Sequence, residues 1–509
     1  MNKNASFMMA LGACIALATT YPSEARAETL RADDALREAM KKNPQLRAAL
    51  SDVTAAQAST TRESARLDPT LTLSLGATHT KSPSLSPGAS SVLVGTSNVA
   101  QADATLTKTL PWGTQLSASV GSTASKTATP FVLGSAQGGT QPLVLTVGPG
   151  YLFTAKVGVT QPLLRGAGRD VTMATYNQAV AGETSSRRER DRQASALARD
   201  VLTAYWEVWY ASKSLEVDRR ARDTARAQRD DAVARMETGS LARADVLTFE
   251  TQLATKEETL MQSEVEVKTR TNELARILGR DRDASELSIA EQDPEVPADI
   301  PGELVSRALA SAPEVATKQA NLSLTEVQER TAADSYRPRL DLDAYVQSQG
   351  LGNEDIPSAF SQFAGFGVFS AHVGLTLELP LTGTRRQSEA SRARAATDTA
   401  RGNLAATRAD VATSVGTSVQ KRDLARRRIE LANASAGYAR DQLASQQALF
   451  ASGSGTALQV IQAQDAVQAA SKRLARARAD LVQAHLALSH LVGGLLAEAT
   501  ALLPSGDSR

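Results

Sequence analysis

The chain of 509 residues is poor in cysteine, in aromatic side chains and in net charge. It has one cysteine and four histidines, and aromatic residues make up 4% of its composition. Its 56 Lys and Arg residues are matched by 55 Asp and Glu residues, which argues against a polybasic nucleic-acid binder. Scarce aromatic residues and abundant alanine argue against a single thick core and favour slender helices that approach one another closely.

Residues 1–27 have the features of an export signal. Lys3 supplies a positive charge, residues 7–20 are mostly apolar, and Ala25-Arg26-Ala27 forms a cleavage site with small residues at its ends. Residues 11–14 also resemble a lipobox, so lipid anchoring at Cys14 is the disfavoured alternative. With cleavage after Ala27 no cysteine remains, which excludes a disulfide, a zinc-thiolate site and a thiol nucleophile.

Long apolar runs are also missing after the leader. No later stretch reaches the roughly 20 uninterrupted apolar residues that a membrane-spanning helix requires. If the exported chain crosses a membrane, we expect it to do so with strands.

An internal repeat is the clearest organisational feature. Residues 42–46 and 311–315 share a pattern around Pro44 and Pro313, and Gly239-Ser240 recurs as Gly453-Ser454. We predict a duplicated chain with halves at 28–288 and 303–492, a linker at 289–302 and a tail at 493–509. Each half is expected to contain a helix, strands, a long helix, a tight turn and a further helix.

Apolar residues recur every seventh position after each turn, which is typical of coiled-coil packing. The alternative is an ordinary amphipathic helix in a globular core. The two series are Val246, Leu253, Leu260, Val267 and Leu274, and Val460, Val467, Leu474, Leu481 and Leu488, the second accompanied by Ala463, Ala470, Ala477 and Ala484.

Helix lengths suggest how the helices pair. Residues 169–236 and 385–450 contain no proline, so each can form a helix near 100 Å long at about 1.5 Å per residue. The predicted helices at 29–67 and 241–278 are about half as long, as are those at 303–336 and 456–492. Two short helices stacked end to end would therefore match one long helix, a layout suited to the wall of a long tube.

Between the helices, apolar residues alternate with polar ones, as in strands with one apolar and one polar face. Residues 81–100 and 122–150, rich in Ser, Gly, Thr and Pro, are predicted to be exposed loops. The predicted strands lie near residues 70–79, 102–110, 113–121, 151–161, 339–348 and 367–379.

These six strands are too few for a membrane barrel, because closed barrels begin at about eight strands. An unclosed edge cannot face lipid, where its backbone groups would have no partners. The sequence therefore predicts a mainly α chain with a β-barrel portion, internally duplicated, whose barrel is shared between chains. A soluble antiparallel sheet with one wet face is the alternative.

The repeated helix-strand-helix pattern resembles the TolC family of outer-membrane efflux ducts. The resemblance is carried by Pro69 and Pro338 before the strands, by Gln161-Pro162-Leu163 and Leu379-Pro380-Leu381 after them, and by the stretch from Gly239 to Asp245-Val246-Leu247. It marks Pro69, Pro162, Pro338 and Pro380 as junctions between barrel and helices.

The resemblance implies a homotrimer with one shared β-barrel in outer-membrane lipid and a long helical coiled-coil barrel across the periplasm. It also implies a periplasmic adaptor (a membrane fusion protein) and an inner-membrane RND or ABC transporter. Together these would form a tripartite efflux or type I secretion system that exports drugs, metals or polypeptides. No cofactor, metal or nucleic acid is implied.

The two predicted turns between helices are expected at the end far from the outer membrane. By resemblance they would meet the adaptor; alternatively, their glycines only cap helices. The residues concerned are Gly239, Ser240 and Leu241 in the first turn, and Gly453, Ser454 and Gly455 in the second.

By resemblance, the residues just after these turns line a periplasmic aperture. Asp245 fits the acidic pattern, whereas Gln459 and Gln462 stand where acids are expected, with Asp465 one turn further on. We predict a weakly acidic gate made by Asp245 with help from Asp465. The alternative is that Asp245 is favoured only by the dipole at a helix N-terminus.

Two strands depart from the family pattern of four per subunit. The pair at 102–110 and 113–121, joined at Pro111-Trp112-Gly113, leads either to an eighteen-stranded trimer barrel or to a hairpin outside the barrel wall. The sequence favours the hairpin outside the wall. Trp112 is either an interfacial anchor or a packed loop residue.

Nothing in the sequence indicates an enzyme. His485 and His490 lack the spacing of a metal pair and are predicted to be packing or surface residues. No usable Ser, His and Asp grouping emerges. The rival to an exit duct is a soluble periplasmic coiled-coil scaffold with a small β domain.

Overall fold

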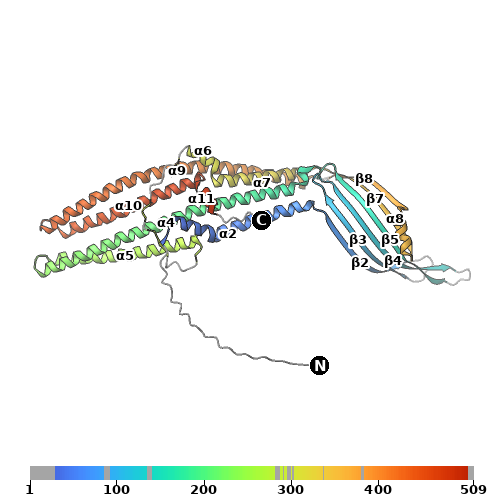
Figure 1. Ribbon diagram of the computed structural model, residues 1–509, viewed down its shortest axis with the longest axis horizontal. Coiled ribbons are helices and arrows are strands. Elements are labelled where there is room, and N and C mark those ends of the chain that lie inside the picture. Colours follow the sequence, from blue (N-terminus) through green and yellow to red (C-terminus); the bar gives the residue numbers. More distant parts are fainter. Residues whose placement is uncertain are drawn as a thin grey trace, which may run out of the picture.

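The computed structural model describes residues 29–84, 92–134, 140–280, 287–290, 292–294, 300, 303–335, 337–379 and 383–502. The predicted export signal, Cys14 and Pro380 lie outside these residues. The molecule is elongated, with a bundle of long helices at one end and a curved sheet at the other (Figure 1). The fold is thus mainly helical with a sheet portion, as predicted.

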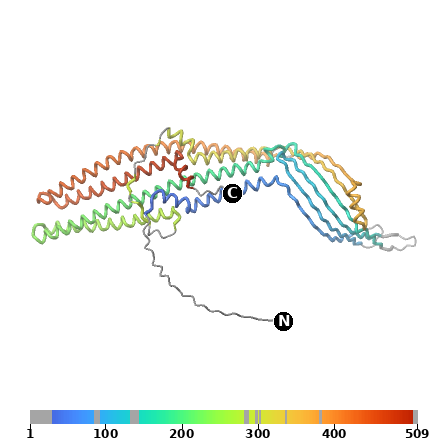
Figure 2. The backbone as a smooth tube through the Cα atoms, in the orientation of Figure 1, coloured from blue at the N-terminus to red at the C-terminus, as the bar shows by residue number. Residues whose placement is uncertain are grey.

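Two long helices run the length of the bundle. They are α4 (Ala174–Glu237) and α9 (Thr384–Ala451), of 64 and 68 residues. Each is flanked by shorter helices that together cover its length (Figure 2). Along α4 lie α1 (Ala32–Lys42), α2 (Pro44–Ser64) and α5 (Arg243–Leu278), and along α9 lie α6 (Leu304–Ser311), α7 (Pro313–Ser335) and α10 (Ala457–Leu491).

The helices predicted at 29–67 and 303–336 are each interrupted, contrary to expectation. The first stops before Asn43, whose side-chain oxygen accepts hydrogen bonds from the backbone N–H groups of Gln45 and Leu46 and so caps a new helix. Pro44 occupies the first turn, where its missing N–H costs nothing. The second is broken at Ala312, again before a proline, Pro313.

The short helices meet end to end at two junctions of similar construction. Gly279, at φ +75°, ends α5 against Lys42, and a Cβ there would lie 2.8 Å from the carbonyl oxygen of Lys42. Gly493, also at φ +75°, ends α10 against Ser311 with the same 2.8 Å clearance. Only glycine allows both the left-handed backbone and this close approach.

Alanine and apolar heptad positions form the contacts between the helices. The four alanines Ala463, Ala470, Ala477 and Ala484 are all buried, as expected for closely packed helices. The largest core cluster joins α1, α4, α5 and α10 where short helices meet. A short helix at the C-terminus, α11 (Gly494–Leu502), adds Leu495 to it and was not predicted.

All six predicted strands belong to one antiparallel sheet in the order β2-β3-β4-β5-β7-β8. A helix, α8 (Ile356–Ala364), lies between the last two strands in sequence. The strands are β2 (Thr70–Ser84), β3 (Leu93–Thr109), β4 (Gln115–Gly134), β5 (Thr140–Pro162), β7 (Arg339–Asn353) and β8 (Val368–Glu378).

Two expectations about the strands are wrong. The pair β3 and β4 lies in the middle of the sheet rather than outside it, because β3 pairs with β2 and β4 pairs with β5. The segments 81–100 and 122–150 are largely strand where described, since polar Ser and Thr residues continue the ladders well past the predicted ends. Composition typical of loops therefore concealed long hairpins.

Minor elements complete the described chain. They are η1 (Ala65–Leu67), α3 (Arg169–Thr172) and a small parallel sheet of β1 (Thr29–Leu30) with β6 (Ser288–Ile289). Within the described residues, no single helix is long and apolar enough to cross a membrane; α10 and α11 pass that test only as a pair bent by 82°.

Candidate duct aperture and helical seam

The turns that end the two helical hairpins have the same backbone geometry. Gly239 and Gly453 have φ values of +76° and +77°. The N–H of Ser240 donates to the carbonyl oxygen of Arg235, and the N–H of Ser454 donates to that of Leu449, both at 2.9 Å. These bonds close the last turn of α4 and of α9 as glycine-dependent caps. Both turns lie at the end of the bundle far from the sheet (Figure 1).

The predicted tip residues differ in exposure. Gly239, Ser240, Gly453 and Ser454 are exposed. Leu241 instead packs partly into a small apolar cluster that joins the two hairpins. Gly455 is held close to the preceding helix, because its N–H donates to the carbonyl oxygen of Leu449 at 3.0 Å.

Two phenylalanines join the hairpins just above the turns. Phe249 of α5 and Phe450 of α9 meet edge to face, with ring centroids 6.0 Å apart. Val246 and Ile461 are buried beside them. Apolar packing therefore joins the two hairpins next to their turns.

The predicted aperture residues do not form one cluster. Asp245 lies in the first turn of α5 and is half-exposed. Gln459 closes a capping box with Thr456 at the start of α10, and Gln462 is exposed on the same helix. Gln459 thus has a structural role as the partner of the N-cap residue.

Asp465 is already paired within the chain. Its Oδ1 accepts hydrogen bonds from Lys256 Nζ at 2.6 Å and Gln252 Nε2 at 3.1 Å, both on α5. Lys256 is mostly buried, with 11% of its side chain exposed. This ion pair offsets the charge that Asp465 would bring to an acidic gate.

A column of polar groups that the sequence did not predict runs along the contact of α4 with α10, and we call it the seam. It consists of Asp218, Glu207 and Ser195 on α4 with their partners. Asp218 is 1% exposed; its carboxylate accepts from Gln468 Nε2 at 2.6 Å and Lys472 Nζ at 2.7 Å on α10, and from Ser263 on α5. One buried carboxylate thus ties three helices together.

Glu207 occupies the middle of the seam. Its carboxylate accepts from Arg476 Nη1 at 3.0 Å and from Gln483 Nε2 at 2.6 Å, both on α10. Burial raises the pKa of Glu207, but the hydrogen bonds from Gln483 and Arg476 lower it more, so the group is held below its ordinary value. The carboxylate is therefore charged at neutral pH.

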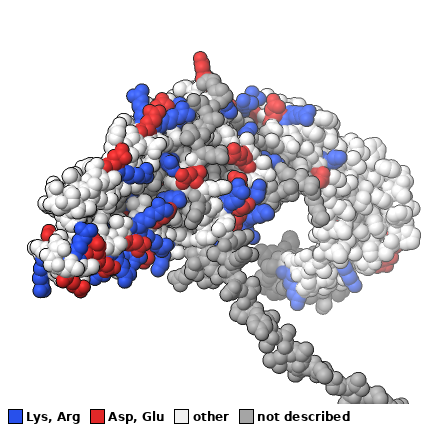
Figure 3. Space-filling model, turned by 60° about the vertical axis from the view of Figure 1, so that its left-hand side comes forward, with Lys and Arg blue, Asp and Glu red and all other residues white. Residues whose placement is uncertain are grey.

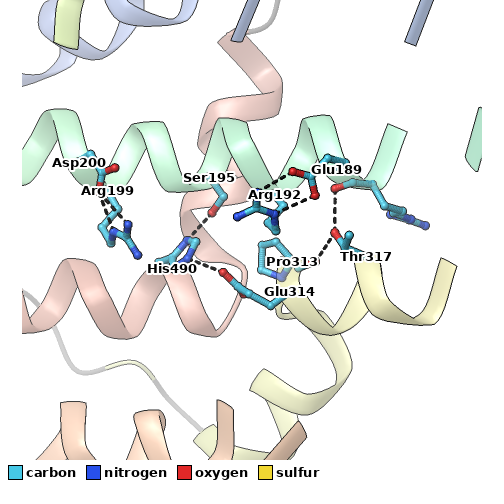
Figure 4. Close-up of polar contacts among 10 residues, drawn as sticks. Glu189, Arg192, Ser195, Arg199, Asp200, Pro313, Glu314, Thr317 and His490 are labelled. Atoms are coloured by element: carbon cyan, nitrogen blue, oxygen red, sulfur yellow. Dashed lines mark hydrogen bonds and ion pairs between the residues drawn. The ribbon is translucent and has the colours of Figure 1, made fainter. Parts of the chain in front are cut away.

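His490 lies at the end of the seam nearest the sheet. Its Nδ1 is 2.8 Å from Ser195 Oγ, and its Nε2 is 2.9 Å from Glu314 Oε1 at the start of α7 (Figure 4). The sequence offered no Ser, His and acid grouping, yet the fold assembles one. Ser195 is fully buried and His490 is 3% exposed, so no substrate can reach the hydroxyl, and the cluster joins helices instead.

No feature of the sequence distinguishes the seam residues beforehand. Glu207, Asp218 and Arg476 lie among many charged residues on long helices, most of which form exposed pairs such as Arg199 with Asp200. Only the pairing of α4 with α10 shows which charges are enclosed.

A groove of about 1290 Å³ beside the seam is lined by further charged residues, including Arg270 and Glu273. The described residues contain no group of His, Cys, Asp or Glu able to hold a metal ion.

The three junction prolines among the described residues lie where strands and helices meet. Pro162 ends β5, and Pro338 immediately precedes β7. The chain that follows Pro162 returns to this junction, because the N–H of Arg165 donates to the carbonyl oxygen of Pro338 at 3.1 Å. Pro69 directly precedes β2.

Comparison with known proteins identifies the type of fold. Residues 304–494 match the sequence model of the outer membrane efflux protein family. No curated protein matches the chain. The solved structure of the outer membrane protein VceC from Vibrio cholerae has a TM-score of 0.65 at 16% identity, covering 91% of this chain and 96% of that one.

Two further structures are similar over comparable lengths. The outer membrane channel CmeC from Campylobacter jejuni has a TM-score of 0.67 at 12% identity, covering 94% of this chain and 90% of that one. The open state of the MtrE channel from Neisseria gonorrhoeae has a TM-score of 0.62 at 16% identity, covering 92% and 89%. The resemblance to TolC-like outer-membrane channels is thereby confirmed, and the fold is shared across nearly the whole chain.

Proposed function

We propose that this chain, whose residues 304–494 match the outer membrane efflux protein family, assembles as a homotrimer into an outer-membrane exit duct. The sheet would line a pore through the membrane, and the helices would continue it into the periplasm. The proteins of similar fold are channels rather than enzymes, which supports a passive conduit.

The observation that carries the proposal is the division of the sheet into two faces. One face of the sheet is apolar along a row that crosses five strands, from β2 to β7. Each residue of this row pairs with the next on the neighbouring strand: Leu71, Leu106, Ala118, Val157 and Val346. Leu71, Leu106, Val157 and Val346 are exposed although they are apolar. The sheet end of the molecule also shows few charges, in contrast to the helices (Figure 3).

The opposite face is polar. Asp103, Ser119, Lys156 and Gln347 occupy it on β3, β4, β5 and β7. A sheet that is apolar on one side and polar on the other suits a wall between lipid and a water-filled pore. An apolar face of this extent would be an aggregation hazard in water.

The two outer strands of the sheet explain why several copies are needed. β2 and β8 are edge strands, and in lipid their unpaired backbone groups would have no partners. The chain contributes an even number of antiparallel strands, so β8 of one copy can pair antiparallel with β2 of the next. Three copies would then close an eighteen-stranded barrel rather than one of twelve.

Opening is proposed to occur at the helical tips. The hairpin of α4 with α5 and the hairpin of α9 with α10 contact each other through the seam, so a shift of one against the other must exchange the partners of Asp218 and Glu207. Exposed tip residues Gly239, Ser240, Gly453 and Ser454 are the proposed contacts for a periplasmic adaptor. An inner-membrane RND or ABC transporter would then deliver drugs, metals or polypeptides.

Fractionation and conductance test the duct against the rival of a soluble scaffold. The duct is expected to resist salt extraction from outer membranes and to conduct ions in planar bilayers. A chain found in the soluble fraction without detergent would favour the scaffold.

Disulfide trapping tests closure between copies. In a Cys14→Ser background, Leu73→Cys on β2 would be combined in turn with Val373→Cys, Leu375→Cys and Leu377→Cys on β8. One pairing is expected to give covalent trimers, whereas Ser119→Cys in the middle of the sheet serves as the control that should not. Monomers from all three pairings would contradict a shared barrel.

A further inference from the structure

Helix α8 is fitted closely to the sheet. Ala359 is fully buried, and it lies over Gly350 and Gly352 of β7. A Cβ on Gly350 would overlap the carbonyl oxygen of Ala359, and one on Gly352 would overlap that of Asp355. The two glycines therefore leave room for a helix to lie directly on the strand.

The face that α8 covers is the apolar one. Ser348, which donates from Oγ to the carbonyl oxygen of Phe363 at 3.0 Å, lies two residues from Val346 and so on the same side of β7. Phe153 of β5 pairs with Gly350 and meets Phe360 edge to face at 6.0 Å. The helix is thus on the proposed lipid side of the sheet, not on the polar side.

The exposed surface of α8 carries no charge and combines large apolar residues with the neutral polar residues Ser358, Ser361 and Gln362. Ile356 is 48% exposed and Phe360 is 54% exposed. No charged residue occurs between Asp355 and His372. The chain has nine phenylalanines, and five of them gather here, at the end of the sheet far from the helical bundle: Phe153, Phe360, Phe363, Phe366 and Phe369.

We propose that α8 is a lipid-contacting helix that lies between the barrel wall and the outer leaflet, with its phenylalanines at the boundary of acyl chains and headgroups. This rests on the proposed barrel. Lipid is the occupant that the surface fits, because α8 carries no charge, exposes Ile356 and Phe360, and lies on the exposed apolar face of the sheet. Aromatic residues concentrate at such boundaries in outer-membrane barrels.

Spin labelling of the full-length protein in liposomes of outer-membrane lipid tests the proposal. In the Cys14→Ser background, nitroxides would be placed at Phe360→Cys on α8, Val373→Cys on the apolar face of β8 and Ser119→Cys on the polar face of β4. Collision rates with oxygen, which partitions into lipid, would be compared with those of a water-soluble nickel chelate. The ratio at residue 360 is expected to be close to that at residue 373 and several-fold above that at residue 119.

The three positions separate the failure of this proposal from failure of the duct. If residue 373 is lipid-exposed while residue 360 collides mainly with nickel, α8 faces water and the inference is overturned, although the duct stands. If residue 360 is inaccessible to both reagents, a neighbouring copy covers α8 and the inference is likewise overturned. If residue 373 itself collides mainly with nickel, the membrane barrel fails.

Discussion

Arg476 and Glu207 face one another across the seam, with one guanidinium nitrogen 3.0 Å from both carboxylate oxygens. Glu207 belongs to the first half of the chain and Arg476 to the second. Arg476 also contacts Asp480 at 2.8 Å and lies 5.1 Å from the centre of the Tyr210 ring. This one side chain therefore connects the helical hairpins on either side of the proposed opening movement.

Removing Arg476 is expected to loosen the seam. The Arg476→Gln variant should lose about 1 kcal/mol of stability, a modest value because the two side chains are 40% and 20% exposed to screening solvent. Its channels should be open for a several-fold larger fraction of time in planar bilayers. Arg199→Gln, which removes an exposed pair on α4, is the matched control and should behave as wild type. Equal open fractions in all three proteins would show that the seam does not restrain opening.

Through Glu314, the stability of the helical bundle is expected to depend on pH in the acid range. Burial raises the pKa of the Glu314 carboxyl, but the hydrogen bond with His490, together with smaller contributions, lowers it more, and the value in the folded state lies below the ordinary 4.5. A carboxyl with a lowered folded-state pKa contributes stability above its unfolded pKa and loses it as pH falls through the folded value. The contribution of the Glu314 carboxylate is thus present above its unfolded pKa and lost in acid.

We therefore expect Glu314→Gln to lower the thermal midpoint of the purified protein at pH 7, with a loss of about 1–2 kcal/mol from the weakened contact. The difference from wild type should shrink as pH falls below about 4.5 and vanish once wild-type Glu314 is protonated. Thermal unfolding followed by circular dichroism across this range measures it. A difference that stays constant down to pH 3 would assign the effect to packing instead of charge.

Lys256 is expected to control how acidic the aperture is. Lys256→Gln frees the carboxylate of Asp465 from its 2.6 Å partner, and three-fold symmetry would triple the added charge. Cation preference, measured as the reversal potential in a salt gradient, should rise in Lys256→Gln and fall in Asp245→Asn. An unchanged preference in Asp245→Asn would remove Asp245 from the gate.

The helical part of the fold was largely predictable from the sequence because heptads and the absence of proline extend over whole helices. Val460, Leu481 and Leu488 are buried as the pattern indicates. The helix interruptions at Asn43 and Ala312 come directly before Pro44 and Pro313, which are visible in the sequence. From the sequence alone, however, a proline in the first turn of a new helix cannot be told from a proline within one continuous helix.

The strand ends and the seam could not be predicted for different reasons. Ser and Thr on the polar face of the sheet give these strands the composition of a loop, so β4 and β5 appeared shorter than they are. The seam depends on which charged positions of α4 and α10 meet. That pairing joins residues more than 200 positions apart, such as Asp218 and Lys472.

Gly350 is expected to be essential for the seating of α8. Gly350→Ala places a Cβ against the backbone of Ala359, which cannot yield without moving the helix. We expect α8 to detach and become susceptible to proteolysis while the trimer persists. Gly402→Ala in α9, where a Cβ meets nothing within 4 Å, is the control and should leave the digestion pattern unchanged. Protection of α8 equal to wild type in Gly350→Ala would show that the contact is not needed.

The tip glycines test whether backbone conformation alone sets the turns. Gly239 and Gly453 have positive φ values, and a Cβ at either position would meet nothing within 4 Å, so Gly239→Ala and Gly453→Ala add only left-handed strain of about 1 kcal/mol each. Gly416→Ala in α9 should instead stabilise the helix by about 0.5–1 kcal/mol. Denaturant unfolding gives these energies, and cross-linking from Ser240 and Ser454 gives adaptor contact. If the alanine variants lose stability but keep the cross-link to the adaptor, the glycines only cap helices. If the cross-linking yield falls with little loss of stability, the adaptor recognises the shape of the turn.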